Sequence, residues 1–305
     1  MCGIVGLLVK GPERRATLGR LAAPMFTCMG ERGPDSGGLA VFGQPAPAGQ
    51  RRFNLFVPDR GHDWQPLLAS FRRAFAGQGG DGAELLPLEN HAVLLTPAEP
   101  GRVRAWLAEC DPSPHLLSVG RCIDVYKDVG RPGDIARRYR FAELAGSHCV
   151  GHTRMATESD VTPRHAHPFT AGEDFCLVHN GSLSNPYMLR RMLQRRGERF
   201  ETDNDTEAAC RFFEWRLAQG DTLEQALEKG FRTLDGFYTF LLGTSDRLTL
   251  VRDAFACKPA VVAETDDYLA VATEFRSLAH LPGIADADLF EPRPEELYSW
   301  KAPAA

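Results

Sequence analysis

Apolar and polar positions alternate along this chain in a way that predicts many short strands and fewer helices. Residues 2–9 form an apolar run broken only by Gly6, which is typical of a buried strand, and the stretch at about 17–29 predicts a helix. The other predicted strands lie at 39–42, 51–57, 91–96, 116–126, 149–153, 175–179, 237–242, 248–252, 260–263 and 268–272. The other predicted helices lie near 64–76, 99–109, 133–145, 184–196, 203–217 and 221–234.

These elements do not form regular strand–helix–strand units with glycine-rich crossovers. The pattern therefore predicts one layered α+β domain over 2–305, with sheets packed face to face and helices outside. A long insertion is expected at about 44–146, where no catalytic motif is found. Its aromatic residues belong to types enriched at interfaces, although most are expected to fill the insertion's own core; they include Trp64, Phe71, Phe75, Trp106 and Tyr126.

Composition and charge exclude several classes of protein. The 35 basic and 40 acidic residues give a net charge of -5, which argues against a nucleic-acid groove. No apolar run approaches the roughly 20 residues of a membrane span, and the chain start lacks the basic segment and cleavage site of an export signal. A cytoplasmic protein is expected. The eight cysteines form no CxxC pair and are mostly expected to be small buried apolar residues.

Cys2 is the cysteine whose position suggests chemistry. Removal of Met1 would leave it at the N-terminus, next to an α-amine with a pKa of about 7.7–8.0. Such an amine accepts protons near neutral pH, so one residue would supply both nucleophile and general base. The alternative is that Cys2 is simply the first residue of a buried strand, and for an isolated Met-Cys start this alternative is favoured.

Three other segments supply polar groups just after predicted strands or at a helix start. Arg154, with the Thr157 hydroxyl close by, is suited to hold a carboxylate. Asn180 and Gly181 offer a side-chain and a main-chain N–H to an oxyanion. The segment 202–207 supplies carboxylates at a predicted helix start, namely Asp203, Asp205 and Glu207, and one of them would pair with an ammonium group. Each segment also has a structural explanation, namely a salt bridge, an Asn-Gly turn and a helix cap, but together they match the needs of hydrolysing the side-chain amide of a free amino acid.

The chain resembles the class II glutamine amidotransferases, the enzymes with an N-terminal nucleophile that begin Cys-Gly-Ile. Six motifs occur in the order of that family and span most of the chain: Cys2–Gly6, Arg32–Gly38, Gly151–Thr157, Ala166–Phe169, His179–Gly181 and Asp205–Glu207. The resemblance implies a four-layer α-β-β-α sandwich. The wide spacing between Arg32 and Arg154, caused by the insertion, is similar to the amidotransferase part of glutamate synthase.

The resemblance also implies a role for each candidate residue. Cys2 would attack the glutamine amide and form a glutamyl thioester, with Asn180 and Gly181 stabilising the oxyanion. The remaining expected roles are the α-carboxylate clamp of Arg154 and Thr157, the α-ammonium partner Asp205, and support of the Cys2 region by Arg32. The pair His165 and His167 invites a metal interpretation, but no third ligand has suitable spacing, and no metal is expected.

We therefore expect a glutaminase subunit that passes ammonia to a separate synthase-type chain, with L-glutamine as substrate. N-methylglutamate synthase is one specific candidate for the assembly, and part of the insertion is expected to contact the partner. No cofactor is expected on this chain, whereas a flavin or an iron–sulfur cluster is possible on partner subunits. Two alternatives remain open, a stand-alone hydrolase of γ-glutamyl amides and a non-catalytic regulator that binds glutamine.

Overall fold

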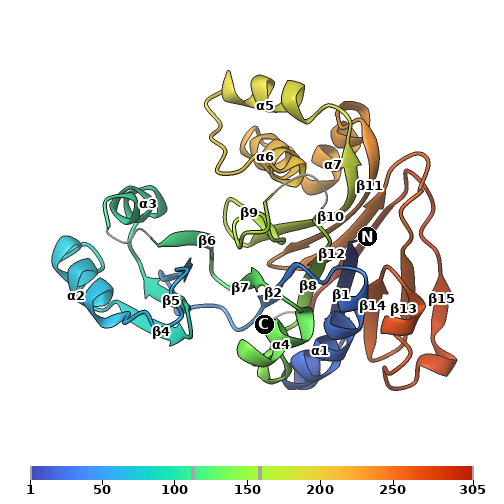
Figure 1. Ribbon diagram of the computed structural model, residues 1–305, viewed down its shortest axis with the longest axis horizontal. Helices are drawn as coiled ribbons and strands as arrows, with labels where there is room; N and C mark the ends of the chain where they lie inside the picture. The colour runs from blue at the N-terminus through green and yellow to red at the C-terminus, as the bar shows by residue number, and fades with distance from the viewer. Residues whose placement is uncertain (1, 111–113, 157–159, 304–305) are drawn as a thin grey trace.

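A computed structural model describes residues 2–110, 114–156 and 160–303 of the chain. Its strands form three sheets of seven, five and four strands. Figure 1 shows the two larger sheets in the main body, with the four-stranded sheet and two helices to one side of it.

The seven-stranded sheet contains the start of the chain. Its strands run in the order β15-β13-β14-β1-β8-β2-β7, and every neighbouring pair is antiparallel. The strands are β1 (Gly3–Val9), β2 (Ser36–Phe42), β7 (Ile123–Val129), β8 (His148–Arg154), β13 (Val261–Glu264), β14 (Tyr268–Ala272) and β15 (Asp288–Phe290). β1 and β8 are central and buried along their whole lengths.

The five-stranded sheet packs against this one. Its order is β16-β12-β11-β10-β9, again antiparallel throughout. The strands are β9 (Phe169–Ala171), β10 (Phe175–Leu183), β11 (Gly236–Thr244), β12 (Arg247–Arg252) and β16 (Leu297–Lys301).

Helices cover the outer face of each sheet. An apolar core joins the larger sheet to α1 (Leu18–Cys28) and α4 (Pro132–Arg138). A second core joins the smaller sheet to α5 (Pro186–Gln194), α6 (Asp205–Ala218) and α7 (Leu223–Thr233). Short 3₁₀ helices lie at Pro12–Thr17, Met29–Glu31, Phe141–Glu143, Phe275–Ser277 and Ile284–Asp286. The expected α-β-β-α layering is confirmed (Figure 1).

The two sheets approach each other closely because small residues lie where they face. A side chain on Gly6 of β1 would place its Cβ atom 2.6 Å from Leu241 Cδ2 on β11. A Cβ atom on Gly243 would lie 2.5 Å from the Phe42 ring of β2. Glycine at these two positions lets the apolar side chains between the sheets interlock without a gap.

The segment 44–146 contains two kinds of structure. β3 (Arg51–Phe56), β4 (Glu84–Leu88), β5 (His91–Thr96) and β6 (His115–Gly120) form the four-stranded sheet, which packs on α2 (Gln65–Ala74) and α3 (Pro100–Ala108). β7 and α4, later in the segment, instead belong to the main body. Trp64, Phe71 and Phe75 are buried in the core of the four-stranded unit, so they fill this core as expected.

The single strand expected at 116–126 is divided into β6 and β7. The Asp174 carboxylate accepts main-chain N–H bonds of 2.8 to 3.0 Å from Arg121, Cys122 and Ile123. These three donors are therefore lost to any sheet ladder, and the chain turns from one sheet into the other. None of the helices within the described residues has the length and apolar character needed to cross a membrane.

Filling the space at Gly6 should destabilise the protein. Gly6→Val adds a residue that favours strands, but its methyl groups would overlap Leu241, so we expect a loss of about 1–3 kcal/mol in the free energy of unfolding. Urea unfolding followed by circular dichroism measures the change. Gly82→Val is the matched control, because nothing lies within 4 Å of a Cβ atom there. Equal stability of the two variants would contradict the close sheet packing.

Candidate functional site

Cys2 lies immediately before β1, at one end of the sandwich. Its Sγ atom is 3.9 Å from the main-chain oxygen of Met155, and the residue is partly exposed. Its carbonyl oxygen accepts a hydrogen bond of 3.1 Å from Arg32 Nε. The Arg32 guanidinium also forms an ion pair with Glu274. Arg32 thus ties the main chain of Cys2 to the segment that follows β14.

Arg154 ends β8 beside the start of β1, because these antiparallel strands pair Gly3 with Thr153. The residue is buried, and its Nη1 atom donates a hydrogen bond of 2.9 Å to the carbonyl oxygen of Asp160. Burial of a guanidinium at the end of a strand is expensive unless polar groups surround it. Thr157, the other residue expected in the carboxylate clamp, lies outside the described residues.

Asp35 fixes the chain just after Arg154. Its Oδ2 atom accepts a hydrogen bond of 2.8 Å from the Ala156 N–H, and its own N–H donates to the Arg154 carbonyl at 3.1 Å. The main chain carrying the arginine is therefore held from both sides by one residue.

Asn180 and Gly181 lie near the end of β10. Asn180 is 5% exposed, and its Nδ2 donor has no hydrogen-bond partner within the described part of the chain. Gly181 has a φ angle of 147°, and a Cβ atom there would lie 1.8 Å from the Phe237 carbonyl oxygen. Only glycine fits this position. A buried donor with no partner is costly, and it indicates that Asn180 is positioned to bind something else.

Strand alternation places three of the candidates on the same face. Even-numbered residues of β1, β8 and β10 contribute to the core between the sheets: Ile4, Leu8, Val150, Cys176 and Val178. By the same alternation Cys2, Arg154 and Asn180 lie on this inter-sheet side, at the ends of their strands. Strand alternation therefore places the side chains of Cys2, Arg154 and Asn180 on the side of their strands that faces the other sheet.

The ends of β8 and β10 also lie at the same end of the sandwich. Gly243 of β11 faces Val150 of β8 and pairs with Cys176 of β10. Four residues further along the two strands lie Arg154 and Asn180, with the start of β1 beside them.

Asp205 begins α6 and bonds to the end of β10. Its Oδ2 atom accepts a hydrogen bond of 2.9 Å from the Leu183 N–H, and Oδ1 is 3.6 Å from His179 Nδ1. Burial alone would raise the pKa of this carboxyl, but His179 and the Leu183 N–H outweigh burial and lower the pKa to about 2. Asp205 is therefore a fixed anion beside the end of β10.

Three buried histidines lie behind these groups. The rings of His152 and His167 are 4.0 Å apart, and His167 Nε2 and His179 Nδ1 lie 2.7 and 3.0 Å from the Thr206 hydroxyl. Burial lowers the pKa of His152 to about 3 and that of His167 well below its usual value. The imidazoles of His152 and His167 are neutral near pH 7, so they add no positive charge to the site.

His165 and His167 have different partners. His165 Nε2 lies 2.9 Å from Asp203 Oδ1, whereas His167 contacts Thr206. Within the described ranges, no three His, Cys, Asp or Glu side chains are grouped to hold a metal ion.

Some of the residues that hold the site in place could be found from the sequence and others could not. Asp35 and Thr206 lie inside the motifs Arg32–Gly38 and Asp205–Glu207, so the motifs include these residues but do not predict what they contact. Glu274, the partner of Arg32, lies in no motif. Only the fold brings it to the start of the chain.

The sequence is similar to those of known proteins along most of its length. A family model described as a glutamine amidotransferase domain matches residues 152–280. The glutamine amidotransferase-like protein GlxB of Rhizobium meliloti is 44% identical over 301 residues, which cover 98% of this chain and 98% of GlxB. The glutamine–fructose-6-phosphate aminotransferase of Shewanella oneidensis is 31% identical over 163 residues, which cover 50% of this chain and 26% of that enzyme.

Two solved structures share the fold. One is the allosteric regulatory enzyme of purine biosynthesis, with a TM-score of 0.63 and 16% identity over 98% of this chain. The other is the glutamine phosphoribosylpyrophosphate amidotransferase of B. subtilis, with a TM-score of 0.59 and 16% identity over 98% of this chain. The chain spans only 46% and 49% of these two proteins. The fold is that of the class II amidotransferases with an N-terminal nucleophile.

The depressed pKa of Asp205 predicts a step in stability at acid pH. An unfolded aspartate has a pKa of about 3.9, against about 2 in the folded state. The carboxylate thus contributes stability that is fully present above about pH 4 and is lost as the pH falls towards 2, on the order of 2 kcal/mol.

The measurement is the free energy of unfolding of wild type and Asp205→Asn between pH 2 and 6. The gap between the two should close as the pH falls. Asp286→Asn, which removes an exposed carboxylate, is the control. A gap that does not depend on pH would contradict the assignment of Asp205 as a fixed anion.

Proposed function

The chain belongs to the glutamine amidotransferase-like family, and from that premise we propose that it hydrolyses L-glutamine to glutamate and ammonia, with Cys2 as nucleophile. The observation that carries the proposal is the buried Asn180 Nδ2, a donor without a partner among the described residues. It lies on the inter-sheet face that Cys2 and Arg154 share. A hydrolase that forms an oxyanion needs such a donor, whereas a protein that only stores or senses glutamine does not.

Cys2 supplies the nucleophile and its own base once Met1 is removed. The free α-amine takes the thiol proton, and the thiolate sulfur attacks the side-chain carbonyl carbon of glutamine. Collapse of the tetrahedral intermediate breaks the carbon–nitrogen bond, and the same proton leaves with the nitrogen as ammonia. Water then attacks the thioester carbon, releases glutamate and restores the thiol.

Asn180 Nδ2 and the Gly181 N–H stabilise the negative oxygen that forms in both steps. Their positions are rigid, because β10 is paired with β11 along its length and Gly181 lies against the Phe237 carbonyl. Donors fixed before the reaction need no reorganisation as charge develops, which is the main advantage of such a site.

Arg154 and Asp205 select a free α-amino acid. The buried guanidinium of Arg154 binds the α-carboxylate, with Thr157 assisting, and the Asp205 anion binds the α-ammonium. These two charges lie at the end of β8 and at the start of α6. Both charged groups of the zwitterion would therefore be recognised. Simple amides, and peptides blocked at the α-amine, lack one or both of these groups and would not be substrates.

The ammonia is proposed to pass to a separate synthase-type chain. The described residues form the amidotransferase layers and one additional four-stranded sheet, so no second catalytic domain is found in them. The match to GlxB covers 98% of GlxB, so the two chains are of nearly the same length. The match to the Shewanella enzyme covers only 26% of that enzyme. A glutamate synthase-like or N-methylglutamate synthase complex is the specific assembly that we propose.

Replacing Cys2 by alanine should abolish glutaminase activity without unfolding the protein. Release of ammonia and glutamate from glutamine should fall at least about 10³-fold, since no other thiol takes part in the proposed site. Cys257→Ala, which removes an exposed cysteine, is the matched control and should retain wild-type rates. Mass spectrometry of the wild type should show a chain without Met1. Activity within a few-fold of wild type in Cys2→Ala would rule out the nucleophile.

Asn180→Ala should reduce turnover far more than substrate binding. Loss of one oxyanion donor costs on the order of 10²–10³ in kcat, whereas KM for glutamine should change by less than about threefold. Steady-state kinetics separate the two constants. The outcome that contradicts the assignment is an increase in KM at unchanged kcat, since Asn180 would then bind the ground state or shape a turn.

A further inference from the structure

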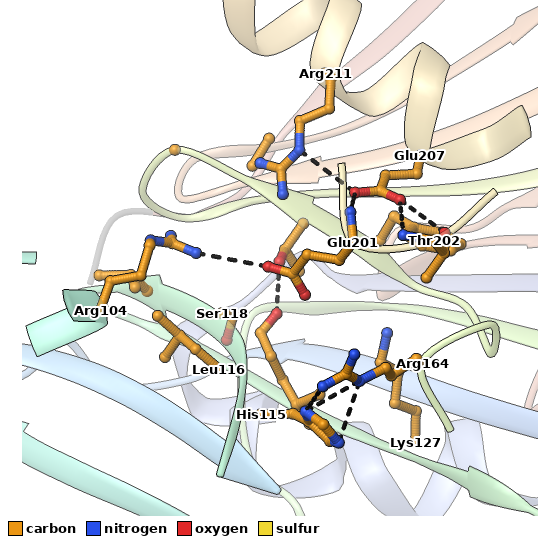
Figure 2. Close-up of a pocket in the computed structure, with 16 residues that line it drawn as sticks. Arg104, His115, Leu116, Ser118, Lys127, Arg164, Glu201, Thr202, Glu207 and Arg211 are labelled. Carbon is orange, nitrogen blue, oxygen red and sulfur yellow. Dashed lines mark hydrogen bonds and ion pairs between the residues drawn. The ribbon is translucent and has the colours of Figure 1, made fainter. Parts of the chain in front are cut away.

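A small polar cavity lies between the four-stranded sheet and the main body. Its walls come from β6, from β7 and β9 of the two larger sheets, from the segment before α6 and from α6 itself. Its volume is about 50 Å³, enough for roughly three to five water-sized groups. Figure 2 shows Arg211 and Glu207 on one wall, with His115, Arg164 and Lys127 on the opposite wall.

Two buried donors point to a ligand in this cavity. Lys127 is 6% exposed, and its Nζ atom donates to the carbonyl oxygens of Ala166 and Pro168 at 3.0 and 3.3 Å. The ammonium group also lies 5.0 Å from the centre of the Phe169 ring. It has three hydrogens, so one of them is not taken by a carbonyl. Ser118 is 4% exposed, lines the same cavity, and its hydroxyl has no hydrogen-bond partner within the described part of the chain.

Arg164 adds a second cation at the mouth of the cavity. Its Nε and Nη2 atoms contact the His115 ring at 3.1 and 2.6 Å. Burial, together with the charge of Arg164, lowers the pKa of His115 to about 4, so the ring is neutral near pH 7. It therefore accepts a hydrogen bond from Arg164 and does not repel the guanidinium charge. His115 thus holds the guanidinium in place without neutralising its charge.

The acidic groups of the cavity are already engaged. Glu207 accepts hydrogen bonds of 2.7 to 2.8 Å from the N–H groups of Glu201 and Thr202 and from the Thr202 hydroxyl, and it lies 3.8 Å from Arg211 Nε. The Glu201 carboxylate lies 3.9 Å from Arg104 Nη1. Lys127 and Arg164 have no carboxylate partner among the described residues, so the cavity favours an anion.

We propose that this cavity binds the carboxylate of a small aliphatic acid. A carboxylate would accept hydrogen bonds from Lys127, Ser118 and Arg164. Its short carbon chain would contact the apolar part of the lining, namely Leu116, Leu117, Val119 and Phe169. A phosphate ion fits less well, because it needs polar partners on every side.

The cavity is connected to the proposed glutamine site. Lys127 holds the two carbonyls on either side of His167, and His167 contacts the Thr206 hydroxyl at 2.7 Å. Thr206 in turn lies 3.3 Å from Asp205 Oδ1. A bound carboxylate that draws on Lys127 would therefore change how firmly Asp205 is held. This consequence rests on the proposed function, whereas the binding itself does not.

Isothermal titration calorimetry of the full chain with acetate, acetamide and inorganic phosphate at constant ionic strength tests the binding. Acetate should bind saturably, and acetamide, which has the same shape without the charge, should bind at least about tenfold more weakly. Phosphate should also bind more weakly than acetate. Absence of saturable acetate binding, or tighter binding of phosphate, would overturn the proposal.

Variants assign the binding to this cavity. Arg164→Gln and Lys127→Met should each weaken acetate binding at least about tenfold; Arg164 is at the surface, so its variant remains informative if Lys127→Met fails to fold. Arg195→Gln, at an exposed arginine of the main body, is the matched control. Arg154→Gln should retain acetate binding, which excludes the proposed glutamine clamp as the acetate site, and loss of binding in this variant instead would refute the cavity.

Glutamine kinetics then test the connection. Saturating acetate should shift KM for glutamine at least about twofold in the wild type and leave it unchanged in Arg164→Gln. An equal shift in both proteins would overturn the coupling. If no glutamine is hydrolysed while acetate still binds, the proposed function fails and the cavity assignment stands.

Discussion

The close contact between the two large sheets is the constraint on which the candidate site depends. Gly6 and Gly243 carry no side chain where β1 and β11 face their neighbours, so the sheets interlock at a fixed register. That register decides which strand ends lie opposite each other. Within the smaller sheet, a shift of one residue in the pairing of β10 with β11 would turn Asn180 away from the inter-sheet face. The position of the proposed catalytic amide in this fold is therefore a consequence of core packing, several residues away from the proposed chemistry.

The same packing makes the site costly. A buried Asn180 donor that has no partner among the described residues costs about 1–3 kcal/mol, and Gly181 holds a main-chain conformation that other residues avoid. Asp205 recovers part of this cost, since its contacts with His179 and with the Leu183 N–H make it a stable anion. The neutral rings of His152 and His167 fill the space behind without adding charge. Asn180 Nδ2 is one of several buried polar atoms that have no partner among the described residues, and it lies where the proposed substrate would meet it.

The sequence was informative where periodicity and chemistry coincide. The long buried strands β1, β8 and β10 were recognisable from apolar runs, and the motifs at their ends identified Cys2, Arg154 and Asn180 as candidates. Short or edge strands were missed, including β9 and β15, because three residues carry no periodicity. The division of 116–126 was also hidden, since Asp174 acts on it from about 50 residues away. Side-chain bonds over such distances leave no local pattern.

The four-stranded sheet is joined to the main body by polar bonds as well as by apolar packing, in which Phe56 and Leu117 enter the core between the large sheets. The Tyr139 hydroxyl of the main body lies 2.8 Å from Asn90 Oδ1, and Arg52 forms two bonds with Asp124. Such contacts are directional, so they hold the unit at one angle and leave space between the layers. A junction of this kind can contain a cavity lined by charged residues, which a close-packed apolar junction cannot. The four-stranded sheet therefore has a structural consequence beyond a longer chain. Its strand β6 forms one wall of a cavity that the two larger sheets and their helices alone would not enclose.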